Sequence, residues 1–162
     1  MSDVAEVIES ALAELELEHE RHGDRFVVAL PGEKRLKTAC WLTIGAHALE
    51  IEAFVMRRPD ENHEKVYEFL LQRNVRMYGV AWAIDGNGDV YLAGRVPLAS
   101  VGAEEIDRLL GAVLEYADGS FNALLELGFG SSIRREWAWR VKRGESLANL
   151  AAFADFAQRL AD

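Results

Sequence analysis

AIDGNGDVYLAGRVPL, residues 83–98, is the stretch that decides how the second half of the chain folds. Its acidic start places Asp85, Asn87 and Asp89 at alternate positions, as in a calcium-binding loop. A loop of the EF-hand type also needs glutamate at its twelfth position, where this chain has Val96. Asp-Gly and Asn-Gly between alternating apolar residues are instead typical of a tight β-hairpin turn. The stretch therefore predicts two antiparallel strands and no metal ligand.

Alternation of apolar residues with a period of two predicts further strands on the N-terminal side of this hairpin. Three of them precede a helical segment, and the fourth is the first strand of the hairpin itself, whose second strand is DVYLAGRVPL (89–98). Pro31 with Gly32 and a small turn around Gly45 separate the first three. The predicted strands are RFVVAL (25–30), KTACWLTI (37–44), ALEIEAFVM (48–56) and YGVAWAI (78–84).

Helical spacing of apolar residues predicts four helices around these strands. The first runs until Gly23, and the second covers about 60–75. The longest, 103–127, carries an apolar stripe that can cross the whole sheet, and GFGSS (128–132) is predicted to stop it. The last is a short helix whose predicted inner face consists of Leu147, Leu150, Ala154, Ala157 and Leu160.

The grouping of strands into blocks with local hairpins, rather than in strict alternation with helices, indicates an α+β fold. The predicted order is helix, three antiparallel strands, helix, two antiparallel strands and a long helix, followed by a C-terminal helical extension. The length of the chain suits a single domain, which we expect to cover 1–162 with 131–162 as the extension.

The charge of the chain is negative overall but unevenly distributed. The formal net charge of −9 argues against nonspecific attraction to nucleic acid or to an anionic membrane. Residues 1–20 contain seven acidic and no basic side chains, whereas 131–144 contain five basic and one acidic. Cys40 is the only cysteine, no apolar run approaches the ~18 residues of a membrane span, and the acidic N-terminus lacks a signal-peptide pattern. These features predict a cytoplasmic protein.

None of the familiar catalytic or metal-binding patterns is complete in the sequence. HEKVY (63–67) has Tyr67 where a zinc protease has its second histidine. His19 and His22 lie one turn apart in the predicted first helix, without a third ligand nearby. There is no Gly-x-Ser-x-Gly elbow, phosphate loop or dinucleotide-binding pattern. We therefore predict no catalytic residue, no cofactor and no metal site, and a protein that is not an enzyme.

The segment IRREWAWRVKRG (133–144) interleaves arginine with tryptophan, a combination that can stack on bases and neutralise phosphates. In an extended conformation both tryptophans would lie on one face, and the arginines would pair with the acidic first helix. Packing within the chain or in a dimer is favoured over binding of an acidic partner, and nucleic acid is the least favoured. The candidate contact residues are Arg134, Arg135, Trp137, Trp139 and Arg140.

The segment RRPDENHEKVYEFLLQRNVRMYGVAWAIDGNGDVYLAGRVPL (57–98), with LLELGF (124–129), resembles the YbjN family of bacterial sensory transduction regulators. The tail SSIRREWAWRVKRGESLANLAAF (131–153) is similar to the actinobacterial branch of that family. The resemblance covers nearly the whole chain and implies the fold of type III secretion chaperones, a strongly bent antiparallel sheet flanked by helices. It also implies a homodimer that binds protein partners, and it transfers no catalytic residue.

Two functions fit these observations. The first is non-enzymatic protein binding, as a chaperone-like protein or a regulatory adaptor, through a sheet face or an exposed strand edge. Trp41, Phe54 and Met56 are the predicted contacts on the less covered face, and the alternative is that they form a second layer of core. The second is a small-molecule-sensing regulatory domain with a pocket between the sheet and the long helix, suggested by the small residues of 78–84.

Overall fold

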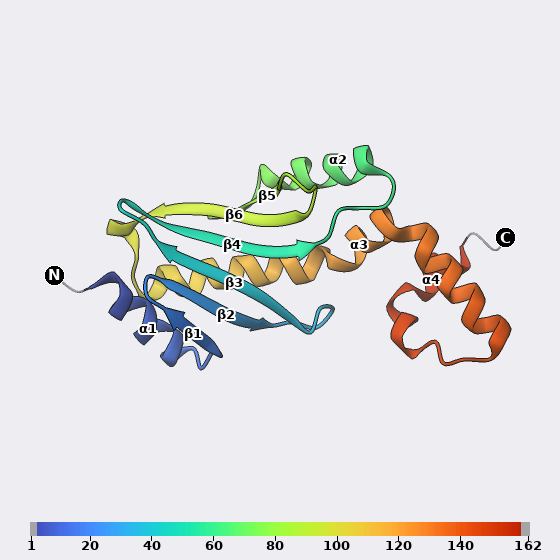
Figure 1. Ribbon diagram of the computed structural model, residues 1–162, viewed down its shortest axis with the longest axis horizontal. Helices are drawn as coiled ribbons and strands as arrows, with labels where there is room; N and C mark the ends of the chain where they lie inside the picture. Colours follow the sequence, from blue (N-terminus) through green and yellow to red (C-terminus); the bar gives the residue numbers. More distant parts are fainter. Residues whose placement is uncertain (1–2, 160–162) are drawn as a thin grey trace.

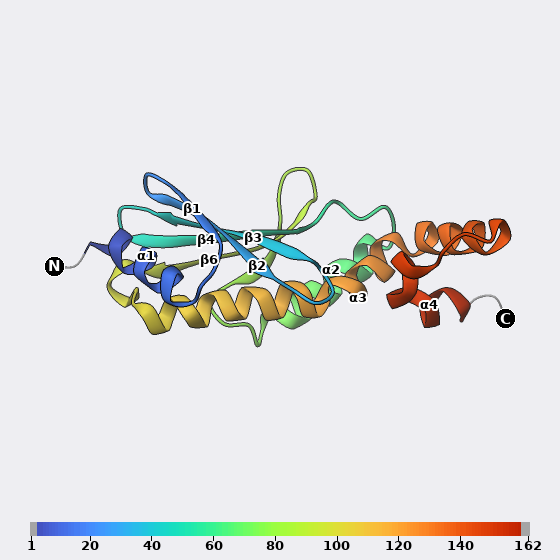
Figure 2. The ribbon, with the colours of Figure 1, turned by 90° about the horizontal axis from the view of Figure 1, so that it is seen from below.

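A six-stranded antiparallel sheet forms one layer of the protein, and the helices lie on one of its faces (Figure 1; Figure 2). The computed structural model describes residues 3–159. The strands are β1 (His19–His22), β2 (Arg25–Pro31), β3 (Lys37–Ile44), β4 (Ala48–Met56), β5 (Ala81–Ile84) and β6 (Val90–Pro97). They are ordered β1-β2-β3-β4-β6-β5 across the sheet. The predicted α+β fold and its antiparallel pairing are confirmed.

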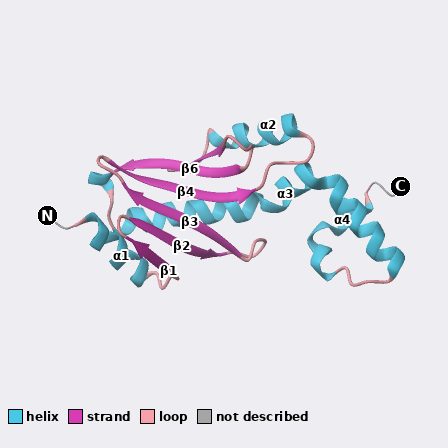
Figure 3. Ribbon diagram, viewed as in Figure 1, coloured by secondary structure: helices cyan, strands magenta, loops and turns pink. Residues whose placement is uncertain are grey.

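One long helix runs beneath the sheet along most of the length of the molecule (Figure 3). Its buried stripe includes Ile106, Leu109, Val113 and Leu124, as the helical spacing predicts. The helical segments are α1 (Val4–Glu14), α2 (His63–Asn74), the short η1 (Leu98–Ser100), the long α3 (Ala103–Arg143), the short η2 (Ala148–Phe153) and α4 (Ala154–Gln158).

The chain between α1 and β2 forms an edge strand instead of continuing the first helix. After α1 ends, Glu16 adopts a left-handed conformation with a φ of 56°. The segment His19–His22 then pairs with β2, with His19 opposite Val28. Because this edge strand has no alternating apolar residues, its sequence gives no strand signal. The helical spacing assigned to His19 and His22 was therefore wrong, and the sheet has six strands rather than five.

The strand predicted over 78–84 is shorter, and the space beside its first residues is filled. β5 begins at Ala81, because Gly79 before it has a φ of 74°, which glycine adopts at little cost. A Cβ on Gly79 would collide with the Leu109 side chain of α3. The space that the small residues were expected to leave between sheet and helix is therefore core at this point.

The glycine-containing stretch 128–132 bends α3 rather than ending it. Phe129 has non-helical backbone angles, with φ of −134° and ψ of 20°, and the helix then continues to Arg143. A Cβ on Gly128 would lie 3.0 Å from the Cβ of Pro59, so the loop before α2 passes close to the bend. The predicted stop at this stretch was therefore wrong.

The loop before α2 satisfies backbone groups that the bend exposes. The Asp60 N–H donates to the Gly128 carbonyl oxygen at 3.0 Å, and the Glu61 carboxylate accepts from the Ser131 N–H at 2.6 Å. This hydrogen bond from the Ser131 backbone lowers the pKa of the Glu61 carboxyl. Because these loop residues serve the bend, α2 begins only at His63, later than predicted.

Candidate functional site

The open face of the sheet carries two of the three predicted contact residues. Trp41 on β3 and Phe54 on β4 lie on the face opposite the buried side chains of their strands. The Arg25 guanidinium lies over the Trp41 ring, 4.6 Å from its centroid. Phe54 packs edge-on against Tyr91, with centroids 5.4 Å apart, and is 37% exposed. Phe54 therefore exposes part of its apolar ring to solvent on the open face of the sheet.

Met56 lies on the core face instead, and a β-bulge explains why. Phe54 pairs with Tyr91 and Met56 with Val90, so Val55 is an extra residue in β4. The bulge turns Met56 inward, where its side chain is only 3% exposed. Strict alternation placed Met56 on the same face as Phe54, and a single inserted residue reverses that placement.

A groove opens where the sheet splits at the end of β4. The pairing of β3 with β4 ends at Cys40 opposite Ala53, and beyond this point β2 and β3 diverge from β4 (Figure 1). The opening has a volume of ≈450 Å³, and α3 forms its floor. We call it the split-sheet groove. The residues that line it include Arg35, Phe54, Met56, Phe121, Leu125 and Phe129.

The loop between β2 and β3 places a cation over this groove. Asp118 of α3 accepts hydrogen bonds from the backbone N–H groups of Lys34 and Arg35, each at 2.9 Å. The Arg35 guanidinium donates to the Phe54 carbonyl oxygen at 2.8 Å and lies 5.3 Å from the Phe121 ring centroid. Partial burial lowers the pKa of Arg35. Within residues 3–159 no carboxylate lies close enough to Arg35 to form an ion pair, so this charge is available to a partner.

The arginines of the C-terminal extension serve contacts within the extension itself. The extension lies at the opposite end of the molecule from α1 (Figure 1). The Arg134 guanidinium lies 4.1 Å from the Phe156 ring centroid, and Arg140 pairs with Glu136 at 2.7 Å. Arg135 is exposed. Within one chain, the predicted pairing of these arginines with the acidic first helix is therefore wrong.

The two tryptophans of this segment lie on a helix, so they do not share one face as an extended segment would require. Trp137 is half-buried and Trp139 is exposed. Farther along the extension, Phe153 and Ala157 are its buried apolar residues. Ala157 belongs to the predicted inner face of the last helix, whereas Leu160 lies outside the described residues.

A second apolar surface lies beside the short edge strand β5, and sequence reasoning missed it. Leu71 on α2 and Val75, which directly follows that helix, are 66% and 85% exposed, and Ile84 of β5 is 47% exposed. We call these three residues the α2–β5 patch. The Asn74 side chain accepts from the Trp82 N–H at 2.6 Å and donates to its carbonyl oxygen at 3.2 Å. The edge of β5 is therefore partly covered, which disfavours addition of a partner strand there.

The acidic turn between β5 and β6 is a hairpin turn. The Asp85 carboxylate accepts from the backbone N–H groups of Asn87 and Asp89, at 2.9 and 3.0 Å. The Asp89 carboxylate accepts from the Arg58 N–H at 2.8 Å. Both carboxylates therefore hold backbone, and the predicted hairpin is confirmed by the antiparallel pairing of β5 with β6.

Neither a metal-binding cluster nor a membrane-spanning helix is found in the part of the chain that the structure describes. Residues 3–159 contain no group of three or more histidine, cysteine, aspartate or glutamate side chains that could hold a metal ion. Among the same residues, no helix combines the length and the apolar composition needed to cross a membrane.

Several solved structures share this architecture at low sequence identity. A chain of the ExsC–ExsE complex is 16% identical with a TM-score of 0.55, covering 76% of this chain and 97% of its own. The Yersinia pestis type III secretion chaperone SycH, solved with a fragment of YscM2, is 17% identical with a TM-score of 0.53, covering 71% and 97%. A chain of the HopA1–SchA chaperone–effector complex is 15% identical with a TM-score of 0.52, covering 74% and 97%. The type III secretion chaperone-like fold is thereby confirmed.

Relatives at high identity come from mycobacteria. An uncharacterized protein of Mycobacterium tuberculosis is 54% identical over 157 residues, which cover 93% of this chain and 86% of the relative. An uncharacterized protein of Mycobacterium leprae is 62% identical over 130 residues, which cover 80% and 71%. A family model described as "Putative bacterial sensory transduction regulator" matches residues 5–126. On this match over most of its length, the chain belongs to the YbjN family.

Proposed function

We propose that the protein is a non-enzymatic binding protein, a chaperone-like protein or regulatory adaptor, that holds an apolar segment of a protein partner in the split-sheet groove. The observation that carries the proposal is the groove itself. Phe54, Phe121 and Leu125 line an opening that stays in contact with solvent although its walls are apolar. Apolar surface of this kind, rimmed by charge, is typical of interaction sites.

The rim of the groove favours a partner segment that carries acidic residues. Arg35 lies over the groove without an ion pair in the described chain, whereas Arg57, which lies over the Phe129 ring at 4.2 Å, is paired with Asp60 at 3.0 Å. Arg35 is therefore an unpaired cation at the groove of a chain whose net charge is −9. An acidic segment with one or two large apolar side chains fits both features.

The solved neighbours support a binding role, because each of these structures is of a complex: with an effector, with ExsE and with a fragment of YscM2. The proposal includes a homodimer in the cytoplasm, with residues 131–162 as an extension of a single domain. The α2–β5 patch is the surface on which we expect two copies to meet, because Leu71 on α2 and Val75 after it are large apolar residues that are mostly exposed.

Affinity purification of the full chain from cells that produce it, followed by mass spectrometry, tests the groove. Phe54→Asp should lose the partner, because burying one large apolar side chain contributes about 1.5–3 kcal/mol, or roughly tenfold to hundredfold in affinity. Trp41→Ala, on the same face of the sheet but outside the groove, is the matched control and should retain it. Retention of the partner by Phe54→Asp, with both variants folded, would exclude the groove as the binding site.

The oligomeric state tests the patch separately. Leu71→Glu places a charge in the centre of the α2–β5 patch, and light scattering coupled to gel filtration should then give the mass of one chain. Wild type and Trp139→Ala, whose side chain is exposed on the extension, should both give twice that mass. A wild-type chain that is monomeric at high concentration would end the dimer proposal and leave the groove proposal untouched.

A further inference from the structure

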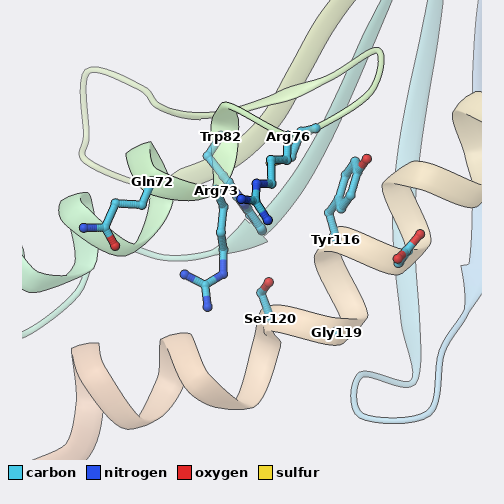
Figure 4. A pocket seen from close by; sticks show the side chains of 9 residues that line it. Gln72, Arg73, Arg76, Trp82, Tyr116, Gly119 and Ser120 are labelled. Carbon is cyan, nitrogen blue, oxygen red and sulfur yellow. The ribbon is translucent and has the colours of Figure 1, made fainter.

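A cavity lined by charged, polar and aromatic side chains lies between α2 and α3, away from the split-sheet groove (Figure 4). Its volume is ≈580 Å³, within the usual range for small-molecule sites. Arg73 at the end of α2 and Arg76 in the turn after it extend toward the turn of α3 that carries Tyr116 and Ser120 (Figure 4). Two cations, a hydroxyl and an aromatic ring therefore face one space.

The two arginines have no charge partner among the described residues. Neither Arg73 nor Arg76 takes part in any ion pair within residues 3–159. Arg73 stacks on Phe69, 3.2 Å from the ring centroid, and donates one hydrogen bond to the Phe69 carbonyl oxygen at 3.3 Å, which leaves other N–H groups free. Glu115 is the one carboxylate among the lining side chains, so the lining carries a net positive charge.

The apolar wall of the cavity is fixed in place. Trp82 is 5% exposed, and the Asn74 side chain holds its backbone by two hydrogen bonds. The Trp82 indole N–H is buried without a hydrogen-bond partner, which is costly for a donor of this kind. Tyr116 is oriented by the hydrogen bond that its hydroxyl accepts from the Tyr78 N–H at 2.9 Å. Trp82 and Tyr116, each held in this way, form the aromatic wall of a cavity that Arg73 and Arg76 also line.

We propose that this cavity binds a nucleotide, a phosphate group joined to a planar ring. A guanidinium presents parallel N–H donors that match phosphate oxygens, and Arg73 and Arg76 together can neutralise a doubly charged phosphate. Tyr116 and Met77, which are partly exposed, offer the surface on which a flat ring packs, together with the small exposed part of Trp82. The volume accommodates one such molecule but not a folded polymer, and the net charge of −9 opposes binding of nucleic acid along the surface.

Isothermal titration calorimetry of the full chain at low salt tests the proposal, with ADP, GDP and UDP as probes. At least one of these diphosphates should bind with a stoichiometry of one per chain, and its affinity should fall as the salt concentration rises. Adenosine, guanosine, uridine and inorganic phosphate should each bind at least tenfold more weakly. Arg73→Ala and Arg76→Ala should each weaken binding about tenfold to hundredfold, the usual effect of removing a charged hydrogen bond. Arg108→Ala is the matched control, because Arg108 is an exposed arginine on α3 that faces Glu105 outside the cavity.

Thermal melts of each variant show whether it is folded, and both cavity arginines are exposed, so their removal should leave the core intact. Absence of binding by all three diphosphates would overturn the proposal. Unchanged affinity in the Arg73→Ala, Arg76→Ala double variant would do so as well. Inorganic phosphate binding as tightly as the nucleotides would refute the role of the aromatic wall and with it the nucleotide assignment.

Discussion

Asp118→Asn is the substitution that most directly tests how the groove is built. The Asp118 carboxylate on α3 accepts two backbone N–H groups, those of Lys34 and Arg35, at 2.9 Å each. It thereby fastens the β2–β3 loop, which carries Arg35, to the floor of the groove. Asparagine keeps an oxygen acceptor and nearly the same helix propensity, so the substitution removes the charge and little else.

The expected loss of stability follows from these two hydrogen bonds. A hydrogen bond to a charged group contributes about 1.5–3 kcal/mol and a neutral one about 0.5–1.5 kcal/mol. Removing the charge from two bonds would therefore cost roughly 2–3 kcal/mol in a buried site. Because the loop is partly exposed, solvent screening reduces this to about 1 kcal/mol. For a chain of this length, the melting temperature should fall by about 2–4 °C.

The same loss should depend on pH. The pKa of Asp118 is lower than its ordinary value. Partial burial acts to raise this pKa, but hydrogen bonds from the backbone amides of Arg35, Glu33 and Lys34 lower it by more. A carboxyl whose pKa is lower in the folded state stabilises the fold above its unfolded pKa of about 3.9. That stabilisation is lost as pH falls through the folded pKa. The difference in melting temperature between wild type and Asp118→Asn should therefore be at its full size at pH 7. It should disappear at acidic pH.

Thermal denaturation followed by circular dichroism over this pH range measures the difference. Asp107→Asn, at an exposed position of the same helix, is the control and should melt like wild type at every pH. A melting temperature for Asp118→Asn equal to wild type at neutral pH would refute the reasoning. So would a deficit of constant size down to acidic pH, because the charge would then not be its source.

Three other substitutions or treatments follow from the packing. Glu61→Ala should lower the free energy of unfolding by about 1 kcal/mol in urea denaturation, because the Ser131 N–H at the bend of α3 loses its acceptor. This loss of stability should disappear as the pH falls through the lowered pKa of Glu61. Leu124→Ala should cost about 2–5 kcal/mol by the same measurement, since its fully buried side chain fills the core under the sheet. Cys40 should not react with a thiol reagent at pH 8 in the native protein, because burial raises its pKa to about 12, and full reaction should appear only after unfolding.

The elements that the sequence predicted are those whose signal is local. The hairpin needed only Asp-Gly and Asn-Gly between alternating residues, and α3 needed only its apolar spacing. β1 depends on its pairing with β2, because its residues have no alternation of their own. At the bend of α3, the groups that keep the helix going come from the loop at 60–62, far away in sequence. A glycine-rich stretch by itself indicates the end of a helix. The sequence therefore predicted that α3 ends at 128–132, because the contacts that continue the helix are not visible in that stretch.

The candidate groove was within reach of sequence reasoning only in part. Phe54 could be found, because it interrupts the polar face of its strand. Phe121 and Leu125 belong to the helical stripe that periodicity assigns to the core, and only the divergence of β3 from β4 brings them to the surface of a groove. Met56 shows the opposite case, because one bulge residue moves it from the open face to the core. Local patterns do not encode where a sheet splits.

The groove and the cavity share α3, and this shared helix determines which variants can tell them apart. Glu115 to Ser120 borders the cavity, and Phe121 to Phe129 borders the groove, so a substitution on these turns would disturb both sites. Phe54 on β4 and Arg76 after α2 each touch one site alone. Phe54→Asp should therefore lose the protein partner and keep nucleotide binding, and Arg76→Ala should do the reverse. Loss of both activities in either single variant, with the fold intact, would contradict the assignment of the two ligands to separate surfaces.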